Sequence, residues 1–153
     1  RQQRSRAPLF WVGAHGGAGE TSLEALAPQW SATDHTWPLA TASDRARVVV
    51  VARTHMSGLL AAQSALTQWA SGGVPFVDVL GVVFVADAPG RIPRLLRDFA
   101  TVVAGGAPRR WDVPWIETWR LGETPTLGEA PGRVTRLIEE LNSLLPGALR
   151  TTK

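Results

Sequence analysis

The sequence predicts an α/β domain in which helices cover both faces of a mostly parallel central sheet. Two buried strands carry this prediction, at residues 48–52 and 79–85, because each is a nearly unbroken apolar run. Strands without alternation of apolar and polar residues are covered on both faces, which is typical of parallel sheets. Predicted helices alternate with these strands, as in a three-layer sandwich. The length of 153 residues suits one domain, which we expect to span residues 8–147.

The remaining elements follow from local patterns. Residues 1–7 are polar and basic and predict a disordered lead-in, and residues 148–153 predict a tail. Apolar runs predict further strands at 9–12 and 110–113, and a short strand at 37–40 within the long connection that precedes residue 48. Apolar residues near helical spacing predict helices at 21–27, 57–71, 92–103 and 133–145. We expect Ser57 to cap the second of these helices.

The composition excludes several classes of function. The chain has no cysteine, which excludes disulfides and thiolate catalysis, and its single lysine is Lys153. No apolar run approaches the roughly 20 residues of a membrane span. Because the chain starts at Arg1, we expect a fragment of a longer cytosolic product.

A glycine-rich loop between the first strand and the first helix is where many α/β proteins bind phosphate, because its N–H groups point at the anion. Here residues 14–22 read AHGGAGETS. The loop resembles the variant P-loop of the MinD/ParA ATPases, K-G-G-x-G-K-[ST]-[ST]. The family's small and hydroxyl positions are kept at Gly16, Gly17, Gly19, Thr21 and Ser22, whereas His15 and Glu20 replace its two lysines.

The resemblance continues downstream of the loop. Residues 48–69 are similar to a strand and helix of the family, and residues 80–87 resemble its strand that ends near a base-facing asparagine, with Asp87 near that place. Residues 113–117 and 121–125 resemble the family's proline-containing loop, so Pro114 and Trp115 would flank the base. No D-x-x-G switch segment occurs before residue 48.

Replacement of the phosphate-binding lysine by Glu20 decides the expected chemistry. A unit charge about 4 Å from a phosphate oxygen interacts by roughly 4 kcal/mol at an effective dielectric near 20. Glu20 would turn this attraction into repulsion. We therefore expect no catalytic residues, no efficient ATP hydrolysis, and no ATP or magnesium cofactor. The three histidines lack metal-ligand spacing, so we also expect no metal site.

Two further groups are candidate partner-binding residues. Arg91, Arg94 and Arg97 recur every three residues and would align along one helix edge, where they would meet either a protein or nucleic-acid phosphate. Trp111 and Trp119 lie near Pro114 in the sequence, where they either fill the core or form an interface patch.

The sequence thus favours a non-catalytic MinD/ParA-like scaffold or protein-interaction domain. The resemblance implies a bacterial, cytoplasmic protein with a role in DNA partitioning, conjugation or secretion assembly. One alternative is a nucleotide-binding switch in which Arg53 or a partner's cation replaces the lysine. Another is a DNA-binding adaptor that uses the arginine stripe. We expect a protein partner; nucleic acid and a homodimer remain open, since the family dimerises across its nucleotide.

Overall fold

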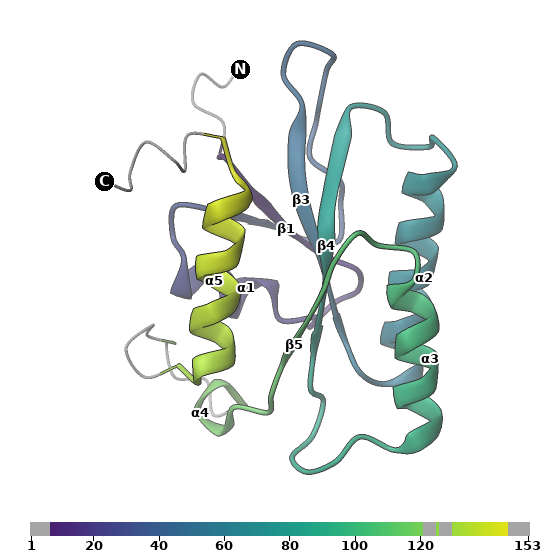
Figure 1. Cartoon of the computed structure of the whole chain (residues 1–153), viewed down its shortest axis with the longest axis vertical. Helices are drawn as coiled ribbons and strands as arrows, with labels where there is room; N and C mark the ends of the chain where they lie inside the picture. Colours follow the sequence, from purple (N-terminus) through teal and green to yellow (C-terminus); the bar gives the residue numbers. More distant parts are fainter. Residues whose placement is uncertain (1–6, 121–124, 126–129, 147–153) are drawn as a thin grey trace.

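A five-stranded, all-parallel sheet forms the centre of the molecule (Figure 1). The computed structural model describes residues 7–120, 125 and 130–146. Its strands lie in the order β2-β1-β3-β4-β5. In chain order their bounds are β1 (Phe10–Gly13), β2 (Ser31–Thr33), β3 (Ala46–Arg53), β4 (Val77–Val85) and β5 (Arg110–Val113). The predicted α/β sandwich is therefore confirmed.

Helices cover the two faces of this sheet in pairs (Figure 1). The first face carries α1 (Glu20–Leu26) and α5 (Gly132–Leu144), and the second carries α2 (Met56–Ala70) and α3 (Arg94–Ala104). The short helix α4 (Glu117–Arg120) follows β5. The chain adds β2 on one side of β1 and then crosses over to add β3 on the other side, so the order in which strands are added reverses at β1. In doubly wound sheets of this order, ligands bind beyond the carboxyl ends of the strands at this reversal point.

The unbroken apolar strands supply two separate cores. Val49 and Val51 of β3 pack on the side of α1 and α5, whereas Val48 and Val50 pack on the side of α2 and α3. All four valines are fully buried, which explains why β3 has no polar alternation.

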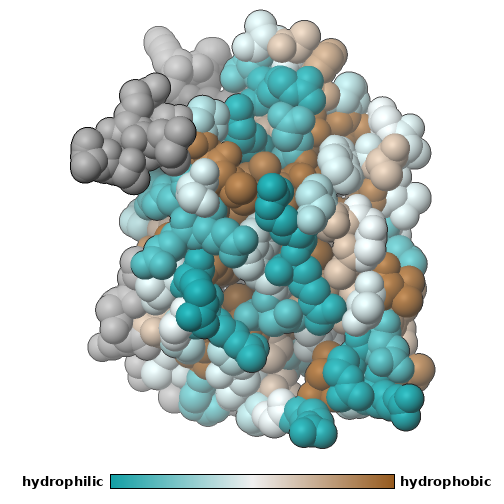
Figure 2. All heavy atoms as spheres, in the orientation of Figure 1, coloured by the Kyte–Doolittle hydropathy of each residue, from teal (hydrophilic) through white to brown (hydrophobic). Residues whose placement is uncertain are grey.

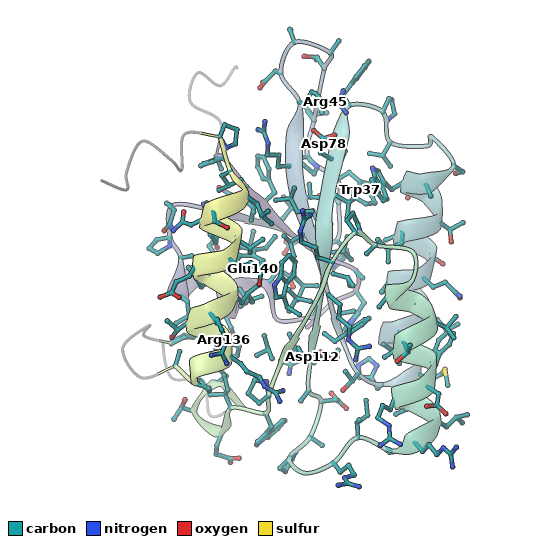
Figure 3. The ribbon with its side chains drawn as sticks, viewed as in Figure 1. Trp37, Arg45, Asp78, Asp112, Arg136 and Glu140 are labelled. Carbon is teal, nitrogen blue, oxygen red and sulfur yellow. The ribbon has the colours of Figure 1, made fainter. Side chains whose placement is uncertain are left out.

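The edge strand β2 differs from the prediction. Residues 37–40 form no strand; Trp37 instead donates a hydrogen bond from Nε1 to Gln68 of α2 at 3.1 Å (labelled in Figure 3). The strand lies at Ser31–Thr33, where it pairs with β1 and where Glu24 accepts a hydrogen bond from the Ala32 N–H at 3.1 Å. Pro38 lacks the N–H that a strand would use, so the predicted position was wrong.

The helix boundaries differ from the prediction by small amounts. Helix α3 begins at Arg94 rather than at residue 92, and α2 begins at Met56. His55, not Ser57, caps α2, because its Nδ1 accepts a hydrogen bond from the Gly58 N–H at 2.9 Å. Helix α4 was not predicted.

Apart from Ala7, the predicted lead-in and tail lie outside the described residues, and so do residues 121–124 of the segment that resembles the family's proline-containing loop. Within the described part of the chain, none of the helices has the length and apolar character needed to cross a bilayer.

Candidate functional site

The carboxyl edge of the sheet gathers most of the residues that the sequence singles out. The glycine-rich loop follows β1, Arg53 ends β3, Asp87 follows β4, and Pro114 and Trp115 follow β5. Parallel strands place all of these segments at the same edge, which is the lower edge in Figure 1. This is also the edge at which doubly wound folds bind ligands.

The loop after β1 needs glycine for its backbone. Gly17 and Gly19 have φ angles of +77° and +114°, which side chains other than glycine rarely adopt. Gly19 also packs closely against β4, since an added Cβ would lie 3.3 Å from Val85. Gly16 is exposed and Thr21 and Ser22 lie in the first turn of α1.

His15 ties this loop to the end of β3. Its Nδ1 lies 2.9 Å from the Gly16 carbonyl, and its Nε2 accepts a hydrogen bond from the Arg53 N–H at 3.0 Å. Both contacts are satisfied by a neutral ring that is protonated on Nδ1. His15 therefore acts as a structural link between the loop after β1 and the end of β3.

The Glu20 carboxylate lies inside the loop. Glu20 is the first residue of α1, and only 5% of it is exposed. A Cβ added at Gly13 would lie 2.6 Å from the carboxyl carbon and from both carboxylate oxygens. The carboxylate thus rests directly on the backbone at the end of β1, where no larger residue than glycine fits beside it.

Arg53 joins the loop after β1 to the loop after β4. Its Nε donates a hydrogen bond to the Gly17 carbonyl at 3.0 Å, and its Nη1 donates one to the Ala86 carbonyl at 3.0 Å. Burial lowers the pKa of the Arg53 guanidinium, and the negative charges of Asp87 and Glu20 oppose this shift. The guanidinium forms no ion pair with either of these carboxylates. Arg53 therefore provides a cation that is held in place by two carbonyl groups and feels the charge of both acids.

A hollow of about 250 Å³ lies beside Arg53. It is lined by Arg53, Val85, Asp87, Pro114, Trp115, Ile116 and Trp119. Trp115 is held by a hydrogen bond from its Nε1 to Glu117 Oε1 at 2.8 Å. Small-molecule sites usually occupy roughly 300–1,000 Å³, so this hollow is small for a nucleotide.

The structure separates the candidate partner-binding residues. Trp119 lines the hollow beside Trp115, while the Trp111 Nε1 donates a hydrogen bond to Glu140 Oε1 at 2.9 Å. Arg91, Arg94 and Arg97 are all exposed, but Arg91 precedes α3 and so lies outside the helix. Arg94 pairs with Asp98 at 3.7 Å, and Arg97 borders a second hollow.

Sequence reasoning gave too little weight to Arg53 and His55. The sequence suggests Arg53 only as a replacement cation, yet Arg53 makes the contacts that hold the site together. One sequence signal could have identified Arg53 as a site residue: it is a charged residue directly at the end of a buried strand. Such a residue must lie at the carboxyl edge of the sheet. The His55 ring lies 5.2 Å from the His15 ring, centroid to centroid. Among the described residues, no group of three or more histidines and carboxylates is placed to hold a metal ion.

Comparison with known proteins gives one match. Neither a curated protein nor a solved structure matches the chain. A family model matches residues 7–138, which is most of the chain. The chain therefore belongs to that family, which is described as a family of unknown function (DUF6668).

Proposed function

We propose that this chain is a non-catalytic protein-interaction or scaffold domain of MinD/ParA-like type, whose phosphate loop is closed from within. The observation that carries the proposal is the position of Glu20. Its carboxylate is nearly fully buried against Gly13, inside the loop that would surround a phosphate group. An incoming phosphate would meet a negative charge in place of a lysine.

The state of Arg53 supports the same proposal. Its guanidinium is the cation at the loop, but Nε and Nη1 already donate hydrogen bonds to the Gly17 and Ala86 carbonyls. A phosphate would have to displace these bonds to use Arg53. The acids that face the guanidinium, Glu20 and Asp87, would also repel the phosphate.

A nucleotide-binding switch is the second candidate. Arg53 favours it, because an arginine lies at the loop where both family lysines are missing. The buried Glu20 carboxylate places it second. A role in partitioning, conjugation or secretion assembly extends the proposal and comes only from the resemblance in the loop.

Titration with Mg-ATP tests this proposal. Calorimetry and tryptophan fluorescence would be measured on the native chain, on Glu20→Lys and on Glu139→Lys, which makes the same charge change on the exposed surface of α5. We expect no saturable binding by the native chain or by Glu139→Lys. Glu20→Lys should bind at least about tenfold more tightly than the native chain, a difference of about 1.4 kcal/mol.

Trp115 and Trp119 line the adjacent hollow and report on ligand entry by fluorescence. Micromolar binding of ATP by the native chain would contradict the proposal and favour the nucleotide switch.

A further inference from the structure

Among the described residues, strand β5 leaves one edge of the sheet open. In this part of the chain it pairs only with β4, and the Arg109 and Val113 carbonyls accept hydrogen bonds from the Val82 and Ala86 N–H groups of that side, each at 2.9 Å. Main-chain groups alternate in direction along a strand. The N–H and C=O groups of Arg110 and Asp112 therefore face away from the sheet, and no hydrogen bond from the described part of the chain reaches them.

Arginines from three elements surround this open edge. Arg97 comes from α3, Arg110 from β5, and Arg133 and Arg136 from α5. Figure 2 shows hydrophilic side chains over the strip between α5 and α3, where β5 lies in Figure 1. We call this surface, made of Arg97, Arg110, Asp112, Arg133 and Arg136, the β5 groove.

The groove has an excess of unpaired positive charge. Its two nearby carboxylates are already engaged: Asp112 pairs with Arg110 at 3.1 Å, and Glu140 accepts the Trp111 hydrogen bond. In Figure 3, Arg136 and Glu140 lie on α5 and Asp112 lies on β5 between the helices. Within the described ranges, Arg97, Arg133 and Arg136 form no ion pair. Four arginines thus face two carboxylates, Asp112 and Glu140, and an excess of two positive charges is left for an outside acid.

Hollows lie on both sides of the strand. One, of about 500 Å³, is bordered by Arg97, Arg110 and Arg133, and its floor includes Phe84 and Trp115. The other, of about 260 Å³, is bordered by Trp111, Arg136 and Glu140. A strand added beside β5 would send successive side chains to opposite faces of the sheet, and so into these two hollows in turn.

We propose that the β5 groove binds a short, extended, acidic segment of a partner protein. The segment pairs with the outward N–H and C=O groups of Arg110 and Asp112, and its carboxylates meet Arg97, Arg133 and Arg136. This inference rests on the proposed function, because it names the kind of partner that the interaction domain takes. Pro114 ends the open edge, since it has no N–H to donate, so the paired stretch is short.

The open strand edge and the groove's arginines disfavour two other occupants, nucleic acid and a second copy of this chain. Nucleic acid has no peptide groups to pair with the outward N–H and C=O groups of the strand edge. A second copy of this chain would place the arginines of one groove against those of the other, because a twofold interface brings the same surface together. An acidic peptide satisfies both the main-chain groups and the charges.

Selection from a displayed library of random nonapeptides tests the inference. The baits are the native chain, the double variant Arg133→Ala/Arg136→Ala, and the control Ser64→Glu/Thr67→Glu, which lowers the net charge by the same two units on the exposed surface of α2, outside the groove. We expect the native chain to enrich peptides with aspartate or glutamate at alternating positions. The control should keep their affinity, and the groove variant should lose at least about tenfold. Thermal unfolding checks that both variants are folded.

Amide NMR shifts induced by an enriched peptide should concentrate at Arg110 and Asp112. The inference is overturned if no acidic peptides are enriched, if the groove variant binds as well as the control, or if double-stranded DNA binds the native chain and competes with the peptide. Repeating the peptide titration with Mg-ATP separates the two proposals. Peptide binding together with ATP binding leaves the β5 groove in place and removes the proposed function, whereas loss of peptide binding alone removes only the groove.

Discussion

At the scale of single residues, Arg53 has the largest structural role at the candidate site. Its main-chain N–H donates to His15 Nε2, and its guanidinium donates to the carbonyls of Gly17 and Ala86. One residue thus fixes two loops that are far apart in the sequence. Partial burial disfavours the charged form of Arg53, and the negative charges of Asp87 and Glu20 favour it.

Replacing Arg53 should therefore destabilise the domain. Hydrogen bonds that involve a charged group contribute about 1.5–3 kcal/mol, and partial exposure of Arg53 reduces this value, so we expect Arg53→Ala to cost about 1–2 kcal/mol. Urea unfolding at neutral pH measures the change. Arg91→Ala, at an exposed position, should stay within about 0.5 kcal/mol and serves as the control. Equal effects of the two variants would contradict this assignment.

At the scale of elements, the end of β1 and the start of α1 fit together through one missing side chain. Gly13 ends β1, and the Glu20 carboxylate fills the space that a Cβ would need. The strand and the helix can therefore take this arrangement only with glycine at the strand end. The fit also explains why the carboxylate stays in the loop, since it is packed there on the backbone.

Gly13→Ala should be destabilising because the new methyl group overlaps the carboxylate. We expect a loss of about 1–3 kcal/mol in the free energy of unfolding, in the range of overpacked core positions. In a Glu20→Ala background the same change should cost less, because the overlapping group is gone, and a double-mutant cycle measures this coupling. At Gly132, where an added Cβ meets no atom within 4 Å, alanine should not destabilise. An equal cost of Gly13→Ala in both backgrounds would show that the packing is not the cause.

The elements also show what the sequence could and could not predict. Strands β3, β4 and β5 were placed within two residues, because a buried parallel strand is a continuous apolar run that local composition reveals. Strand β2 was misplaced because its three residues are half-buried and depend on pairing with β1 and on Glu24. Such tertiary support leaves no local pattern, and the same holds for the four-residue helix α4.

The candidate site was predictable in position but not in its contacts. The resemblance to the MinD/ParA pattern grouped Asp87, Pro114 and Trp115 with the glycine-rich loop, and in the structure all of them follow strands at the same edge of the sheet. The direction of the Glu20 carboxylate and the bonds of Arg53 follow from side-chain packing between elements, which spacing along the chain does not encode. The β5 groove was missed for the same reason, since its arginines come from three separate elements.

At the scale of the whole molecule, the carboxyl ends and the amino ends of the parallel strands carry different groups of charged residues. The carboxyl edge carries the candidate site, and the amino edge carries the ion pair of Arg45 and Asp78 (Figure 3). Two hydrogen bonds, at 3.0 and 2.7 Å, join these side chains just before β3 and at the start of β4. They hold the pKa of Asp78 below its ordinary value of 3.8, chiefly through hydrogen bonding to Arg45.

Acid should weaken this ion pair. A carboxylate whose pKa is lowered by folding stabilises the native state above its ordinary pKa, and the stabilisation is lost as the pH falls through the lowered value. We expect Asp78→Asn to be less stable than the native chain at neutral pH, and the gap to close below about pH 4. Urea unfolding of both chains across this range measures the gap. A gap that is constant with pH would contradict the ion pair.

The position of β1 between β2 and β3 has a consequence for biosynthesis. During translation, β1 and β2 leave the ribosome before β3, and the only sheet they can form together is a narrow pair. Trp11 and Leu9 are fully buried in the folded domain. During translation they stay uncovered until β3 and α5 have been synthesised, and α5 lies near the far end of the described chain. The nascent chain should therefore expose an apolar surface until α5 has been synthesised, and we expect chaperones at the ribosomal exit to bind it.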